Sequence, residues 1–74
     1  MSESISDHFL TVYGTVLEIL PDLGLAHVRT PDSLIYGLSP YTNGLQFEML
    51  QLGQKVRLQV TMKFGRVLHA ELLS

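Results

Sequence analysis

Alternation of apolar and polar positions is the clearest pattern in this chain, and it is longest between residues 9 and 20. One face of the predicted strand carries Leu10, Val12, Gly14, Val16 and Leu20. The opposite face carries Phe9, Thr11, Tyr13, Thr15, Leu17 and Ile19. A period of two indicates a β-strand, and two partly apolar faces favour a long, curled strand in a barrel. The glycine in its middle, at position 14, is typical of a bulge or a sharp coil.

Turn residues divide the rest of the chain into four further strands. Proline and aspartate at residues 21–22 end the first strand, because proline has no amide proton for a ladder and aspartate favours turns. A second strand is predicted at residues 24–29, a turn at 30–33 and a third strand at 34–38, which together form an antiparallel meander. Two final strands, at residues 55–62 and 66–73, are joined by a hairpin turn at 63–65. Alternation predicts that one of them is half-buried, with Val56, Leu58, Val60 and Met62 on its apolar face, and places Leu68, Ala70 and Leu72 together on one face of the other.

The segment between the third and fourth strands is the longest turn-rich stretch. Residues 39–44 predict a crossing loop, and apolar positions from 45 to 52 predict one short helical turn that ends at Gly53. A three-stranded meander, a connector and a final hairpin form the element order of the OB-fold, a small five-stranded Greek-key barrel. We therefore expect an all-β fold with a single domain at residues 9–74, preceded by a flexible arm at residues 1–8.

Composition agrees with this fold and limits the function. The chain has 74 residues, of which 46% are hydrophobic and 16% are charged, as expected for a small globular domain rather than a disordered segment. It contains no cysteine, which excludes disulfides and thiolate metal sites. It has neither a signal-peptide pattern nor an apolar segment of the about 20 residues that span a bilayer, so we expect a cytoplasmic protein that does not bind membranes.

The net charge of −2 argues mildly against a strong nucleic-acid binder, because neutralisation of phosphates by cations dominates such binding. The distribution of charge is more informative than the total. Four of the five basic residues lie in the last third of the chain, whereas the acidic residues lie mostly before it. The two C-terminal strands are therefore expected to carry the basic surface.

Four segments resemble the bacterial cold-shock domain, and together they cover most of the chain. They are GTV at residues 14–16, GLAHV at 24–28, LIYGLS at 34–39 and LGQKV at 52–56. The segments GTVLE at 14–18 and LPD at 20–22 also resemble the opening of the smallest bacterial translation initiation factor, another OB-fold of this size. The cold-shock resemblance implies an OB-fold that binds single-stranded nucleic acid.

The resemblance also implies where bases would stack, and most of those positions lack an aromatic ring here. The exposed phenylalanines of the second strand correspond to Leu25 and His27, and the surface tryptophan of the first strand corresponds to Glu18. The phenylalanine, histidine and phenylalanine of the third strand correspond to Ile35, Gly37 and Leu38. A base stacked on an aromatic ring contributes about 1–3 kcal/mol, so the resemblance combined with these residues predicts weak binding.

We therefore predict weak binding of single-stranded RNA or DNA to the face of the second and third strands. Phosphate contacts are expected from the basic residues of the fourth and fifth strands. The predicted site residues are His27, Arg29, Tyr36, Tyr41, Lys55, Arg57, Lys63 and Arg66.

A protein partner or a second copy of the chain is the alternative. Aliphatic residues stand where the family displays aromatic ones, and a contiguous exposed apolar patch marks a partner site. The predicted patch consists of Leu17, Leu25, Ile35 and Leu38.

No pattern indicates catalysis, and we expect a protein that is not an enzyme and uses no cofactor, metal or small-molecule substrate. Its histidines, His8, His27 and His69, lie in separate segments without an acidic motif beside them, whereas metal sites need several converging ligands. Gly24 stands alone rather than in a phosphate loop, and Ser39 has no basic residue near it in sequence.

Overall fold

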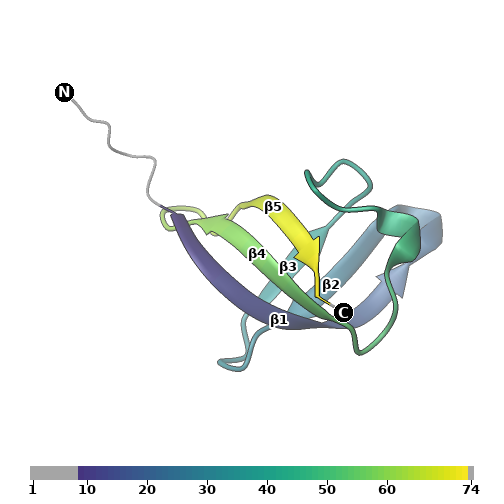
Figure 1. The fold of residues 1–74 in the computed structure, drawn as a ribbon, viewed down its shortest axis with the longest axis horizontal. Helices are drawn as coiled ribbons and strands as arrows, with labels where there is room; N and C mark the ends of the chain where they lie inside the picture. The colour runs from purple at the N-terminus through teal and green to yellow at the C-terminus, as the bar shows by residue number, and fades with distance from the viewer. Residues whose placement is uncertain (1–8, 74) are drawn as a thin grey trace.

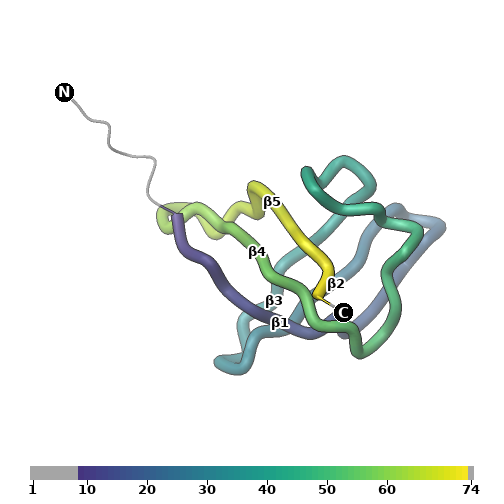
Figure 2. Tube along the Cα trace, in the orientation of Figure 1, coloured from purple at the N-terminus to yellow at the C-terminus, as the bar shows by residue number. Residues whose placement is uncertain are grey.

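The computed structural model describes residues 9–73, which form one curled antiparallel β-sheet (Figure 1; Figure 2). Its strands are β1 (Phe9–Leu20), β2 (Leu25–Arg29), β3 (Ile35–Leu38), β4 (Lys55–Thr61) and β5 (Val67–Leu72). The strand order is β3-β2-β1-β4-β5, and the two outer strands also contact each other. The sheet is therefore a half-barrel, which confirms the predicted all-β class and the meander of the first three strands. The predicted arm at residues 1–8 lies outside the described residues.

β1 is the strand around which the sheet is built, because it belongs to both halves. Its residues 9–15 pair with β4 and its residues 15–20 pair with β2, and the strand curves strongly along its length (Figure 1). Gly14 lies just before the junction. A Cβ atom at this position would lie 2.9 Å from the carbonyl oxygen of Arg29 and still closer to Val28. The missing side chain thus lets β2 approach β1 closely where the sheet coils.

Inward-facing side chains of the five strands fill the half-barrel. Leu58, Val28 and Val56 are completely buried, each on an inward position of the alternation. The other buried apolar residues are Val16, Ala26, Leu38, Leu45, Leu50, Val60 and Ala70. The inward set predicted for the fourth strand is therefore confirmed apart from Met62, which follows β4 and is 59% exposed.

Two β-bulges change which residues face the core, and both overturn predictions from strict alternation. In β1, Leu17 is the extra residue, so Ile19 rather than Leu20 packs against the core. In β5, Leu68 is the extra residue, and Val67 packs against the core in its place. An inserted residue reverses the facing of every side chain beyond it, because side chains alternate with a period of two. Bulges also increase the local twist, which helps the sheet to curl.

Two single 3₁₀ turns are the helical elements of the described residues. η2 (Pro21–Leu23) occupies the predicted first turn, and η3 (Phe47–Met49) lies within the segment predicted to hold one helical turn. Gly53 does not end that turn, contrary to the prediction, because η3 stops before it and Gly53 forms part of the turn into β4 with a φ of 82°. The loop before η3 covers the outer edge of β5, where the Ala70 amide donates a hydrogen bond to the Asn43 carbonyl oxygen at 2.9 Å.

Candidate nucleic-acid interface

The outer face of the sheet places basic residues from two strands beside β1. Arg29 on β2 and Lys55 on β4 both lie opposite Thr15, so the three residues form one row across the sheet. The Lys55 ammonium donates a hydrogen bond to the Thr15 hydroxyl at 3.0 Å, and the Arg29 guanidinium donates one to the Ser33 hydroxyl at 3.4 Å. Neither cation forms an ion pair with another described residue, so both charges remain available to a ligand.

A groove of about 470 Å³ is lined by these two cations. Tyr13 and Thr15 of β1 form part of its wall, and Tyr13 is 54% exposed. Single-stranded nucleic acids are bound by aromatic rings that stack on bases, by hydroxyls that reach the sugar and by cations that neutralise phosphates. The groove brings one group of each kind together.

Arg57 lies next to Tyr13 on the adjacent row, but its charge is shared with a carboxylate. Tyr13 on β1 and Glu71 on β5 are its cross-strand neighbours, and the Arg57 guanidinium donates a hydrogen bond to the Glu71 carboxylate in a surface ion pair. That hydrogen bond and the Arg57 charge lower the pKa of Glu71. The same hydrogen bond, with a smaller contribution from Tyr13, raises the pKa of Arg57. Arg57 therefore adds less net positive charge to the face than Arg29 or Lys55.

The outer face of β2 and β3 differs from the predicted binding face. His27 lies on it as expected, but its Nδ1 atom is 2.9 Å from the carboxylate of Glu18, its cross-strand neighbour. The prediction that Tyr36 belongs to the binding surface is wrong, because Tyr36 is partly buried and packs against the core. The outward positions of β3 belong instead to Ile35 and Gly37, since alternate residues share a face. Within the described part of the chain, β2 and β3 thus expose no large aromatic ring on this face.

The aliphatic patch predicted as a protein-binding surface is only partly present. Leu38 is 1% exposed and belongs to the core, so its inclusion is wrong. Leu17 and Ile35 are 51% and 50% exposed, and Leu25 is partly buried. Leu17 is exposed because it is the extra residue of the β1 bulge. Three of the four predicted residues therefore reach the surface, each from a different strand.

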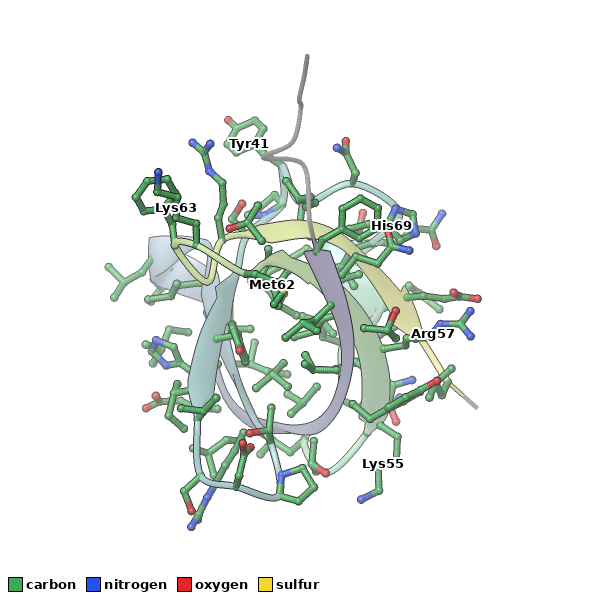
Figure 3. The ribbon with its side chains drawn as sticks, turned by 90° about the vertical axis from the view of Figure 1, so that its left-hand side faces the viewer. Tyr41, Lys55, Arg57, Met62, Lys63 and His69 are labelled. Carbon is green, nitrogen blue, oxygen red and sulfur yellow. The ribbon has the colours of Figure 1, made fainter. Side chains whose placement is uncertain are left out.

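Lys63, Arg66 and Tyr41 lie away from the groove. Lys63 and Arg66 belong to the β4–β5 hairpin, and Tyr41 belongs to the loop after β3. Figure 3 shows Tyr41 and Lys63 in the upper part of the view and Lys55 in the lower part. Tyr41 is 92% exposed, and the Lys63 ammonium lies 5.5 Å from the centroid of the Phe64 ring. The eight predicted residues thus do not form a single site.

Tyr13 is the site residue that the sequence reasoning missed. Alternation places it on the outer face of the first strand, and the basic residues of the fourth strand are equally visible in the sequence. The missing information is the pairing of β1 with β4, which puts Tyr13 opposite Arg57 and Thr15 opposite Lys55. The useful signal is therefore the set of outward-facing residues of the longest strand, combined with the strand order of the sheet.

Residues 9–73 contain neither a cluster of metal ligands nor a membrane-spanning helix. Among residues 9–73, no three or more metal-ligating side chains gather closely enough to hold an ion. No helix in the same part of the chain has the length and apolarity to cross a membrane. Comparisons with protein-family models, with curated proteins and with solved structures found no match.

Proposed function

We propose that this protein is a small OB-fold module that binds single-stranded nucleic acid, RNA in particular, along the outer face of β1. The observation that supports the proposal is the groove of about 470 Å³, lined by Arg29, Lys55 and the half-exposed ring of Tyr13. The strand order β3-β2-β1-β4-β5, in which β1 is shared by both halves of the sheet, supports the OB-fold assignment. The cold-shock resemblance of residues 14–16, 24–28, 34–39 and 52–56 agrees with it.

Charge and stacking have separate roles in this proposal. Arg29 and Lys55 flank β1, so a nucleic-acid backbone that crosses the strand can place one phosphate against each cation. The Tyr13 ring offers a surface to one base, and the Thr15 hydroxyl between the cations offers a hydrogen bond to a ribose hydroxyl. Stacking is tolerant of sequence, because every base has a π-face. The module should therefore bind with little sequence preference.

Binding is expected to be weak, because few groups contribute. One stacked base contributes about 1–3 kcal/mol. On single strands, the slope of log affinity against log salt is about −0.7 for each phosphate neutralised, so two or three cations predict a slope between about −1.4 and −2.1. The net charge of −2 adds no long-range attraction.

Fluorescence anisotropy with labelled oligouridine and oligothymidine, titrated at several salt concentrations, tests the proposal. Lys55→Gln should weaken binding severalfold at low salt and make the salt slope shallower by about 0.7, because one phosphate contact is lost. Lys63→Gln is the matched control, since it removes the same charge beyond the other end of β4, which begins at Lys55 and ends at Thr61. Its affinity and slope should stay close to those of the wild type.

Two results would contradict nucleic-acid binding at this groove. The first is an absence of binding by the wild type at low salt, where phosphate-driven binding is strongest. The second is an equal loss of affinity in Lys55→Gln and Lys63→Gln, which would indicate attraction by total charge rather than by a site.

A protein-binding surface is the second candidate function, and the exposure of Leu17 and Ile35 favours it. Full burial of one such side chain contributes about 1.5–3 kcal/mol to binding. Leu25→Asp combined with Ile35→Asp should disrupt binding of a protein partner, whereas Lys55→Gln combined with Arg57→Gln should leave it intact. The opposite pattern identifies nucleic acid as the ligand.

A further inference from the structure

The first half of β1 has an open edge. β4 pairs with residues 9–15 on one side, but β2 ends at Arg29, opposite Thr15. After Arg29 the chain turns into the loop between β2 and β3. Among the described strands, none pairs with residues 9–13 on their second side, and Figure 1 shows this part of β1 at the border of the sheet.

Alternation of hydrogen bonds identifies the main-chain groups that point to this open side. The amide and carbonyl of Thr61 on β4 bond within the β4–β5 hairpin, so they point away from β1. Phe9 lies opposite Thr61, so these two residues form a pair without hydrogen bonds between β1 and β4. Hydrogen-bonded and non-hydrogen-bonded pairs alternate along antiparallel strands. Thr11 and Tyr13 therefore also belong to pairs without hydrogen bonds to β4. The N–H and C=O groups of these three residues point away from β4.

An apolar groove of about 400 Å³ lies along the same edge. Leu10 and Val12 line it from β1, and Leu34 and Tyr36 line it from the loop and strand across from β1. Leu10 and Leu34 are each about half exposed, at 47% and 51%. A strand added to β1 would point alternate side chains into this groove, because neighbouring strands share the facing of their side chains.

We propose that this edge pairs with the same edge of a second copy, so that the protein forms a two-fold symmetric dimer through β1. An antiparallel register centred on Thr11 places Phe9 of each copy opposite Tyr13 of the other, and Leu10 opposite Val12. The hydrogen-bonded pairs of this register involve Phe9, Thr11 and Tyr13, the residues whose main-chain groups point to the open side. Leu10 and Val12, which form the aliphatic pairs, line the groove together with Leu34 and Tyr36.

The side chains of the edge suit a second copy better than a different chain. Among residues 9–13, every cross-strand pair in this register is aromatic with aromatic, aliphatic with aliphatic or threonine with threonine, and such pairs stabilise antiparallel strands. Residues 9–15 contain no charged residue and no proline, the residues with which proteins prevent sheet edges from pairing. A closed two-fold contact uses the same patch on both copies and leaves neither edge open.

Sedimentation equilibrium of the purified chain without nucleic acid tests the dimer separately from the proposed function. The wild type should approach twice the 8.3 kDa of one chain as concentration rises. Thr11→Lys places two like charges side by side on the two-fold axis and should raise the dimer Kd at least about tenfold. Gln59→Lys is the matched control, because it adds the same charge directly opposite Thr11 on β4, one strand away from the edge. Its dimer Kd should equal that of the wild type.

Thr11→Pro is a second variant that leaves the monomer ladder intact, because the Thr11 N–H points away from β4. It should also abolish the dimer while circular dichroism still shows the folded sheet. A wild type that stays monomeric up to about 1 mM overturns the proposal, and an extended peptide that binds such a monomer would assign the edge to another chain. A dimer that persists in both Thr11 variants, or that Gln59→Lys weakens equally, also overturns it.

Discussion

Replacement of Gly14 with alanine should destabilise the protein, and the structure indicates by how much. The added Cβ atom would lie 2.9 Å from the Arg29 carbonyl oxygen and still closer to Val28, which has no exposed surface. Neither neighbour can move aside easily, since Arg29 contributes main chain within the sheet and Val28 is packed in the core. Overpacking of this kind costs about 1–3 kcal/mol.

Urea denaturation measures this loss directly. A domain of this length has about 4–11 kcal/mol of stability, at about 0.05–0.15 kcal/mol per residue, so the urea midpoint of Gly14→Ala should fall clearly below that of the wild type. Gly37→Ala is the matched control in the same sheet, because its Cβ would lie 3.7 Å from the nearest atom, Cδ1 of Leu25, at an ordinary contact distance. A Gly14→Ala variant as stable as Gly37→Ala would refute the argument that β1 needs glycine where β2 approaches it.

Three further predictions concern the proposed binding face and the ion pair beside it. Tyr13→Ala should weaken oligonucleotide binding about 5–150-fold, the equivalent of one stacked base, without changing the salt slope. Tyr13→Phe keeps the ring and should bind like the wild type. A changed salt slope in Tyr13→Ala would contradict a stacking role. Glu71→Gln should tighten binding in the same titration, because it releases Arg57 from its ion pair. Since the pKa of Glu71 is lowered in the folded protein, the ion pair stabilises the fold above the ordinary carboxyl value of 4.5, and this contribution is lost as pH falls through the lower folded value. The difference in urea midpoint between the wild type and Glu71→Gln should therefore disappear in acid.

β4 shows why part of the fold was predictable from the sequence. Val56, Leu58 and Val60 alternate with lysine, arginine and glutamine, and a strand with one apolar and one polar face has a single favourable orientation on the core. The side chains of these three apolar residues are all buried, as predicted. The turn residues between strands were equally informative, because proline, aspartate and glycine restrict the backbone locally.

β3 shows where the same reasoning fails. Leu34, Ile35, Tyr36 and Leu38 are all large and apolar, so alternation does not identify the face that is buried. The error for Tyr36 and Leu38 follows directly, since their side chains share one face and the core selects it. Bulges produce the second kind of error, at Leu68, because an extra residue in one strand depends on the partner strand and leaves no local pattern.

The proposed binding face could not be located from the spacing of residues in the sequence. Thr15 and Lys55 are far apart in the chain, and the sheet order joins them by a hydrogen bond. The cold-shock resemblance directed attention to β2 and β3, where its aromatic positions are occupied by aliphatic residues, glycine and a histidine next to Glu18. An exposed ring is found instead on β1, the strand with two partly apolar faces.

The two proposals meet at Tyr13, and together they account for how so small a chain could bind nucleic acid with a single ring beside its groove. Phe9 and Tyr13 lie on the outer face of β1. In the proposed register, Phe9 of one copy lies opposite Tyr13 of the other, so each groove gains a second ring next to its own. Stacking platforms in single-strand binders use successive rings for successive bases. The dimer would thus restore, across two copies of β1, the aromatic surface that β2 and β3 lack within one chain.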